Sequence, residues 1–258
     1  LLMSICAGQD EKDLTTLPSF YNHEEQKYFV PEIAPKSAKI GIIKDFRNDS
    51  IDPEVQRVLD SQVEKLKAAG HQIIELEMPT LKYALAVYYI VVPAEVTSNL
   101  SRYDGIRYGY RSEHAKNLSE VFGLSRNEGF MPENKRRIMI GNFVLSSGFY
   151  DAYFKKAEQA RTLIIEEYQK AFEKCDYLLT PVSPSPAFKL GEKVSDPVAM
   201  YFEDVMSVPI NLAGLPSLAY PAGESQDTKM PIGLQLIGQR RSDKSILDFA
   251  KYLAKELN

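Results

Sequence analysis

The stretch that decides the fold reads AKIGIIK at residues 38–44, DPEVQRVLDSQVEKLKAAG at residues 52–70 and QIIEL at residues 72–76. The two outer segments are short and rich in isoleucine, which is typical of buried strands. The middle segment carries apolar residues at helical spacing and starts with Asp52 as a capping residue and Pro53 as the first helical position. A strand, a helix and a second strand in this order predict a parallel strand pair joined by a crossover helix.

The remainder of the chain alternates predicted helices with short strands, which indicates an α/β fold. Residues 81–174 carry mainly helical patterns, and 151–174 are expected to form one long helix. Three prolines in TPVSPSP at 180–186 exclude a helix there and predict an extended loop. The other expected elements are a buried strand at 177–179, a short helix at about 197–206, strands at 217–220 and 233–237, and a final amphipathic helix that starts at Ser242 or Asp243.

The amino-terminal residues do not resemble the start of a domain. LLMSICAG at residues 1–8 is apolar without a basic flank, so it is not expected to be a signal peptide, and Gly8 is placed to end a helix. Residues 9–37 are polar, contain prolines and lack periodicity, which predicts a linker that lies over the surface. We therefore expect the chain to be a fragment of a longer protein.

The composition excludes several classes of function. A net charge of −4 and a pI of about 5.6 argue against a basic nucleic-acid surface over the whole molecule. Cys6 and Cys175 form no CxxC pair, and the three histidines form no ligand cluster, so zinc is not expected. We expect both cysteines to be free thiols in a reducing compartment, which favours a cytoplasmic location. No apolar run is long enough to span a bilayer, so no membrane partner is expected.

Four blocks carry residues that suit a binding or catalytic site. The first is dense in Tyr and Arg, whose planar faces and fixed donors can build a polar binding wall. The second has three adjacent cations, Lys135, Arg136 and Arg137, which cannot share one helix face, so one of them can point inward and bind a carboxylate. Each block also has a simpler interpretation: a packed surface helix and loop for the first, a solvated basic face for the second, and a turn-forming scaffold for the other two. The blocks are YYIVVPAE (88–95) with SNLSRYDG (98–105) and RYGYR (107–111), KRRIMIG (135–141) with SSGFYDAY (146–153), DYLLTPVSPSPAF (176–188), and NLAGLP (211–216) with PIGLQLIG (231–238).

In this order and spacing, the four blocks resemble the carboxy-terminal half of amidase-signature proteins. The third and fourth blocks are shared widely in that family, whereas the first and second are similar to the A subunits of glutamine-dependent tRNA amidotransferases. The resemblance implies a mixed α/β sheet flanked by helices, of which residues 1–258 form the carboxy-terminal part. Because the rest of such a domain lies outside this sequence, we expect an exposed apolar patch around Leu178, Leu218, Leu234, Leu236 and Ile237.

The resemblance also implies the chemistry. Amidase-signature proteins use a Ser–cis-Ser–Lys arrangement, in which the lysine deprotonates a relay serine that activates the nucleophilic serine. The family's lysine and both serines lie in a Gly/Ser-rich segment upstream of the part represented here, so no catalytic residue is assigned in this chain and the chain alone is expected to be inactive. The only Ser-Ser-Gly is Ser146-Ser147-Gly148, which lacks flanking glycines and aligns with a non-catalytic stretch, so Ser147 is not expected to be a nucleophile.

Three positions carry over from the resemblance as a glutamine-binding site: Tyr88, Arg137 and Asp204. Arg137 suits the α-carboxylate of glutamine, Asp204 suits the α-ammonium, and the Tyr88 hydroxyl suits the polar end of the substrate. Arg136 and Tyr89 stay open as alternatives for the neighbouring roles.

The implied parent is the ammonia-supplying component of the enzyme that converts Glu-tRNA(Gln) to Gln-tRNA(Gln). Its partners are expected to be the B and C subunits of the amidotransferase, with ATP and Mg²⁺ bound by one of these partners and the charged tRNA contacted mainly through that partner. One alternative is a fragment of another amidase-signature hydrolase that acts on small amides, and another is a non-catalytic binding fragment. A hydrolase of neutral amides has no need of Arg137 and Asp204, so these two residues favour the amidotransferase.

Overall fold

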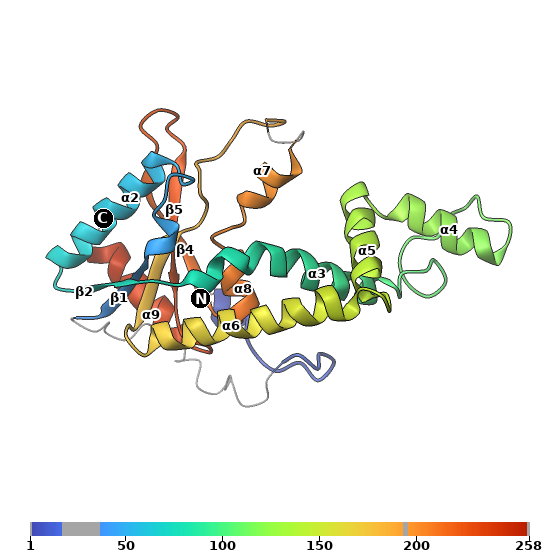
Figure 1. The fold of residues 1–258 in the computed structure, drawn as a ribbon, viewed down its shortest axis with the longest axis horizontal. Helices are drawn as coiled ribbons and strands as arrows, with labels where there is room; N and C mark the ends of the chain where they lie inside the picture. The colour runs from blue at the N-terminus through green and yellow to red at the C-terminus, as the bar shows by residue number, and fades with distance from the viewer. Residues whose placement is uncertain (1, 17–36, 193–195, 257–258) are drawn as a thin grey trace. The chain divides into compact units, whose positions relative to one another are not determined.

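The computed structural model describes residues 2–16, 37–192 and 196–256 of the chain (Figure 1). The chain divides into two compact units, which are described separately below. The first unit is discontinuous in sequence and comprises Leu1–Pro79 and Glu166–Asn258. The second unit is the intervening segment Thr80–Ile165.

The first unit is built on a five-stranded mixed sheet. Its strands are β1 (Lys39–Ile43), β2 (Gln72–Leu76), β3 (Tyr177–Pro181), β4 (Ser217–Glu224) and β5 (Pro231–Ile237). The strand order is β2-β1-β3-β5-β4, in which β2, β1 and β3 run parallel and β5 runs antiparallel to both of its neighbours. The predicted parallel strand pair is therefore confirmed, with Lys39 opposite Gln72 and Ile43 opposite Leu76.

The crossover helix between β1 and β2 is α2 (Pro53–Ala68), as the sequence predicts. Asp52 caps it, because its Oδ1 accepts a hydrogen bond from the backbone N–H of Glu54 at 2.8 Å. At the other end the chain leaves the helix through Gly70, whose φ of 90° lies in the left-handed region that favours glycine. Both ends of the helix are thus fixed by local sequence.

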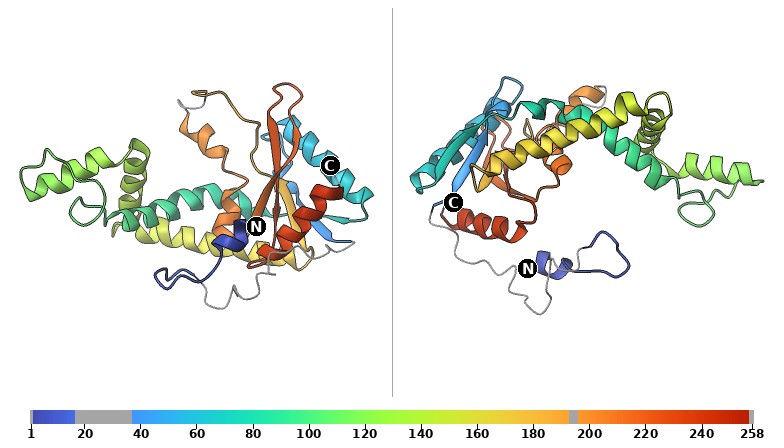
Figure 2. Two further views of the ribbon diagram at one scale, coloured as in Figure 1. Left: turned by 180° about the vertical axis from the view of Figure 1, so that it is seen from behind. Right: turned by 60° about the horizontal axis from the view of Figure 1, so that its bottom comes forward.

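One face of the sheet forms the main core with α2 and the final helix α9 (Asp243–Glu256), which lies against β4 and β5 (Figure 2). Leu59 of α2 and Phe249 of α9 belong to the same buried cluster as Ile40, Leu234 and Leu236 of the strands. These side chains are each at most 1% exposed, so burial of this apolar surface is the main stabilising contribution to the unit.

The apolar patch expected around Leu178, Leu218, Leu234, Leu236 and Ile237 is not formed by these residues, and that expectation was wrong. Four of the five are at most 1% exposed, and Leu218 packs against the core cluster. The reason is that α2 and α9 of this chain supply the cover for Leu218, Leu234 and Leu236 that the expectation assigned to an absent segment. On β4 it is the opposite side chains, Ala219 and Pro221, that are exposed.

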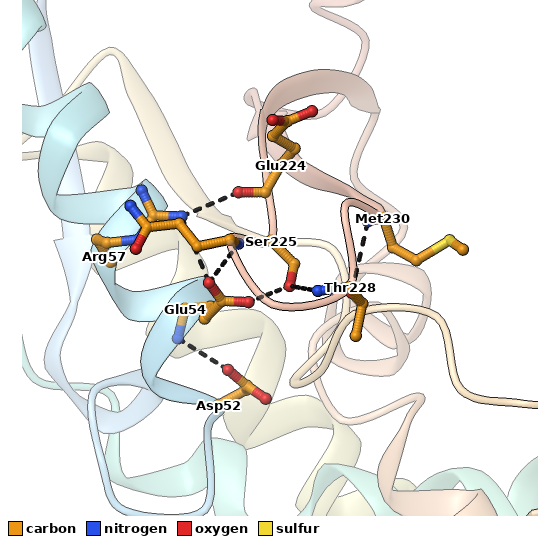
Figure 3. A network of polar contacts seen from close by, with 8 residues as sticks. Asp52, Glu54, Arg57, Glu224, Ser225, Thr228 and Met230 are labelled. Atoms are coloured by element: carbon orange, nitrogen blue, oxygen red, sulfur yellow. Dashed lines mark hydrogen bonds and ion pairs between the residues drawn. The ribbon is translucent and has the colours of Figure 1, made fainter.

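The loop that joins β4 to β5 is attached to the start of α2 (Figure 3). The Ser225 hydroxyl and the backbone N–H of Gln226 both donate hydrogen bonds to the Glu54 carboxylate. The hydrogen bond from Ser225 lowers the pKa of Glu54, so the carboxylate stays ionised and keeps accepting both bonds. Arg57 adds a contact from the next turn, since its Nη2 donates to the Glu224 carbonyl at 2.9 Å.

The smaller elements of the first unit partly differ from the sequence prediction. The helix expected at about 197–206 is shorter, because α7 (Pro197–Phe202) gives way to a turn before α8 (Val208–Ala213), a helix that the sequence analysis did not predict. Gly214 ends α8 with a φ of 66°. Of the predicted surface linker, residues 9–16 form exposed turns, and residues 17–36 lie outside the described residues. The remaining short elements that begin in this unit are α1 (Leu2–Cys6), η2 (Lys44–Phe46) and η3 (Pro79–Tyr83).

The second unit is helical, as the sequence predicts. Its helices are α3 (Ala84–Leu100), α4 (Leu118–Gly129), α5 (Pro132–Leu145), a π-helical turn η4 (Tyr150–Phe154), and the start of α6 (Lys155–Phe172), which continues into the first unit. The long helix expected at 151–174 is therefore present, but its first turn is π-helical. No helix among the described residues of either unit is long and apolar enough to cross a membrane.

Helices α3 and α5 pack closely against each other in this unit. A Cβ atom placed on Gly141 of α5 would lie 2.1 Å from the Pro93 carbonyl oxygen and 2.0 Å from Oγ1 of Thr97 on α3. Oγ1 of Thr97 also donates a hydrogen bond to the Ile138 carbonyl at 2.9 Å. The absence of a side chain at Gly141 therefore sets how closely the two helices approach.

We expect Gly141→Ala to destabilise the protein by about 1–3 kcal/mol, because backbone rather than a flexible side chain blocks the new methyl group. The measurement is chemical denaturation of the purified chain. The matched control is Gly123→Ala in α4, where a Cβ would meet nothing within 4 Å and should stabilise the helix by up to about 1 kcal/mol. Equal effects of the two substitutions would contradict the close contact.

Candidate functional site

Arg137 lies on α5 and is held in one orientation by two side chains. Its Nε donates to Oε1 of Glu133 at 3.1 Å, and its Nη1 donates to the Tyr88 hydroxyl on α3 at 3.2 Å. Its guanidinium carbon also lies 5.9 Å and 5.8 Å from the ring centres of Tyr88 and Tyr89. The close contact at Gly141, one helical turn further along α5, keeps these groups within reach of one another.

Of the three adjacent cations, Arg137 is the one that points inward. Its side chain is 25% exposed, compared with 52% for Arg136, while Lys135 donates to Asn127 at 2.8 Å. Partial burial by itself lowers the pKa of Arg137, but the hydrogen bonds to Tyr88 and Glu133 outweigh it and leave the pKa above its usual value. Arg137 is therefore a fixed positive charge at every physiological pH.

The sequence analysis missed Glu133. Its carboxylate is shared, with Oε2 bound to Nη1 of Arg136 at 2.8 Å and Oε1 bound to Arg137. The signal was available, because Glu133 stands three and four residues before these arginines on one helix. One carboxylate against two guanidinium groups leaves this part of α5 with a net positive charge.

The arrangement is suited to binding a small carboxylate. Within the described residues, Nη2 of Arg137 makes no hydrogen bond, so the edge formed by Nη1 and Nη2 keeps donors for an additional ligand. Both Tyr88 and Tyr89 stay candidates for contacting that ligand, since their rings stand edge to face with centroids 5.0 Å apart beside the guanidinium. Arg136 is less suited, because its side chain is directed to Glu133 and is more exposed.

Asp204 lies in the first unit, in the turn between α7 and α8, and not on a helix as predicted. Its residue is exposed, and its carbonyl accepts hydrogen bonds from the N–H groups of Ser207 at 3.1 Å and Val208 at 3.0 Å. The structure thus brings Tyr88 and Arg137 together in one unit and places Asp204 in the other.

Among the described residues, neither Ser147 nor Cys175 is placed to act as a nucleophile. Ser147 lies in an exposed turn after α5, and no hydrogen bond joins it to another described side chain. Cys175 is buried, and this burial raises the pKa of its thiol to about 11, so the reactive thiolate is scarce at neutral pH. Within the described residues, no group of His, Cys, Asp or Glu is placed to hold a metal ion.

A family model described as Amidase matches residues 1–247 of this chain. The chain belongs to the amidase family. Among curated amidase-family relatives, the A subunit of glutamyl-tRNA(Gln) amidotransferase from Pelagibacter ubique is 45% identical over 258 residues, which is 100% of this chain and 52% of the relative. The protein of the same name from Zymomonas mobilis is 46% identical over 248 residues, or 96% of this chain and 50% of the relative. The chain therefore spans about half the length of the curated relatives it matches.

Two solved structures agree with the fold. The crystal structure of the glutamyl-tRNA(Gln) amidotransferase A subunit from Thermotoga maritima is similar with a TM-score of 0.71 at 32% identity, covering 98% of this chain and 49% of that chain. A 6-aminohexanoate cyclic dimer hydrolase has a TM-score of 0.72 at 18% identity over 99% of this chain and 52% of that one, which shows the shared fold. The expected mixed α/β sheet flanked by helices, as part of an amidase domain, is thus confirmed.

The two cysteines should differ sharply in reactivity. At pH 8 the exposed Cys6 is expected to react with a thiol reagent such as Ellman's reagent, whereas Cys175 is buried and only about one in a thousand of its thiols is ionised. We expect about one thiol per native chain and two after unfolding in guanidinium. Two fast thiols in the native chain would contradict the buried position of Cys175.

Proposed function

We propose that this chain is the carboxy-terminal half of the A subunit of a glutamine-dependent amidotransferase, which hydrolyses glutamine to supply ammonia for making Gln-tRNA(Gln) from Glu-tRNA(Gln). The observation that carries the proposal is the guanidinium of Arg137, held by Tyr88 and Glu133 in a chain 45% identical along its length to a protein of that name. The enzyme is accordingly a ligase that forms a C–N bond with glutamine as the nitrogen donor.

The proposed substrate is free glutamine, which is a zwitterion and calls for one fixed cation and one fixed anion. Arg137 supplies the cation, and its remaining donors bind the α-carboxylate in a charge-assisted contact. Asp204 supplies an exposed carboxylate for the α-ammonium. The Tyr88 hydroxyl fixes the guanidinium and can turn toward the polar end of the substrate.

The bond-breaking groups of the proposed enzyme lie outside residues 1–258. The lysine and the two serines of the Ser–cis-Ser–Lys arrangement belong to the other half of the amidase domain, where the nucleophilic serine attacks the side-chain amide and releases ammonia. The role of this chain is to bind and orient glutamine, so that the amide carbon reaches that serine. Binding energy from Arg137 and Asp204 contributes to catalysis through this orientation.

The proposed assembly is a cytoplasmic heterotrimer with the B and C subunits of the amidotransferase. Ammonia passes to a partner that binds ATP and Mg²⁺ and activates the tRNA-bound glutamate. The net charge of −4 on this chain supports contact with the charged tRNA mainly through that partner.

The first test of the proposal uses the chain alone. We expect the purified chain to release no ammonia from glutamine above a blank, because positioning groups accelerate nothing without groups that act in the transition state. The measurement is a coupled ammonia assay at millimolar glutamine. Ammonia release that Ser147→Ala abolishes would show that the nucleophile lies in this chain after all.

The second test uses the full-length assembled enzyme. We expect Arg137→Ala to lower kcat/KM for glutamine roughly 10- to 150-fold, since a charged hydrogen-bond contact is worth about 1.5–3 kcal/mol. Asp204→Ala should act in the same direction by removing the contact to the ammonium. Free ammonia bypasses this pocket and should still support amidation of the charged tRNA in both variants.

The matched control is Arg136→Ala, which removes the neighbouring cation from the same helix and should leave glutamine kinetics within about twofold of the parent, as for a surface ion pair. Parental glutamine kinetics in both Arg137→Ala and Asp204→Ala would overturn the pocket assignment. Loss of the ammonia-dependent reaction together with the glutamine-dependent one would point to misfolding and also count against it.

A further inference from the structure

Gln235 is a buried polar residue in the middle of β5, and its side chain is on the sheet face opposite the main core. It is 4% exposed, and its neighbours Leu234 and Leu236 point to the core cluster on the other face. A buried amide of this kind needs hydrogen-bond partners, because leaving its polar atoms unpaired away from water is unfavourable.

The partners of Gln235 come from three different segments. Its Nε2 donates to the Pro181 carbonyl at 2.9 Å and to the Met206 carbonyl at 3.1 Å, and its Oε1 accepts from the Ser217 hydroxyl at 3.1 Å. The orientation of the amide is unambiguous, because two carbonyl oxygens can be satisfied only by the amino end. Gln235 therefore ties the turn that contains Met206 to the middle of the sheet.

The same turn has a second attachment on the other side of Asp204. The hydroxyls of Ser183 and Ser185 each lie 3.0 Å from Oε2 of Glu203, so they attach the residue before Asp204 to the proline-rich loop. Asp204 stands between these two attachments, at Glu203 and Met206, and its own residue remains exposed. The turn is thus fixed through its neighbours, while Asp204 stays at the surface.

We propose that Gln235 is a positioning residue that holds the Asp204 carboxylate where it meets the α-ammonium of glutamine, and so contributes to the selection of α-amino amides over amides that lack this group. The inference rests on the proposed function, since it acts through the contact between Asp204 and the substrate. Glu203 with its two serines is the second support of the same turn.

Replacing the Gln235 amide is expected to move Asp204 because the hydrogen bonds that hold the turn are lost. An apolar side chain of similar size at Gln235 leaves the Pro181 and Met206 carbonyls buried without a donor. The turn then relieves the loss by moving Met206 toward water, and Asp204 moves with it. A shift of about 1 Å at a positioning group is enough to impair substrate alignment.

The test compares glutamine with glutaramate, which is glutamine without the α-amino group, as substrates of the full-length assembled enzyme. The measured quantity is the ratio of kcat/KM for the two compounds, because a general loss of folded enzyme lowers both values equally and leaves the ratio unchanged. We expect Asp204→Ala to reduce the preference for glutamine roughly 10- to 150-fold and Gln235→Leu to reduce it roughly tenfold. Adding Gln235→Leu to Asp204→Ala should produce no further loss of preference.

Three controls keep the result interpretable. Gln235→Met, with an unbranched side chain of similar length, repeats the test if the leucine variant folds poorly. Glu203→Ala removes the hydrogen bonds from Ser183 and Ser185 that form the second attachment, and should also reduce the preference. Leu236→Val weakens the opposite face of the same strand without touching the turn, and should leave the preference unchanged.

The possible outcomes distinguish a failure of the proposed function from a failure of the positioning role of Gln235. If Asp204→Ala keeps the preference for glutamine, the role of Asp204 in the proposed function is wrong and the inference about Gln235 falls with it. If Asp204→Ala loses the preference while the Gln235 and Glu203 variants keep it, the proposed function stands and the positioning role is overturned.

Discussion

The pairing of β3 with two different neighbours is the interaction on which the first unit depends. β3 runs parallel to β1 on one side and antiparallel to β5 on the other, and all five of its residues are buried. On the parallel side, β1 is followed by the crossover helix α2 and pairs with β2. On the antiparallel side, β5 pairs with β4 and carries Gln235, which binds the turn that contains Met206. Because a strand buried on both faces has no solvent to satisfy its polar groups, both neighbours are required at once.

Within each unit, polar side chains that are withdrawn from water are compensated by partners of the protein itself. Arg137 is partly withdrawn from water, and Glu133 and Tyr88 compensate its charge while leaving donors for a ligand. Gln235 is fully withdrawn, and its amide is satisfied entirely within the protein. Asp204 is exposed, and hydrogen bonds to Ser183, Ser185 and Gln235 hold Glu203 and Met206 on either side of it. A pre-organised binding site requires side chains that the protein holds in one orientation while some of their hydrogen-bond donors stay available to a ligand. Arg137 meets both conditions.

The sequence analysis correctly predicted elements that are determined by neighbouring residues, and it missed elements that depend on contacts between residues far apart in the sequence. Asp52 and Pro53 set the start of α2 through their own backbone and side chain, so the parallel unit was predicted correctly. The 203–207 turn that follows α7 is held to β5 by the hydrogen bond from Gln235 to the Met206 carbonyl, a contact between residues 29 positions apart that the sequence analysis did not predict. Arg137 and Tyr88 were singled out by resemblance, and their hydrogen bond joins residues 49 positions apart. Glu133 was missed for a different reason, because its spacing of four residues from Arg137 is apparent in the sequence and is sufficient to predict their ion pair.

The discontinuous make-up of the first unit has a consequence for how the protein is made. The backbone of Lys39 binds the Asp176 carboxylate across a sequence separation of 137 residues, and the whole second unit lies between them in the sequence. A ribosome adds about 5–20 residues per second, so β3 is synthesised on the order of ten seconds after β1 and β2. Until then β3 cannot cover the edge of β1. During that interval β1 and β2 have an unprotected edge, which favours aggregation of the newly synthesised chain, and long-range strand pairing of this kind slows folding relative to helical proteins of equal size.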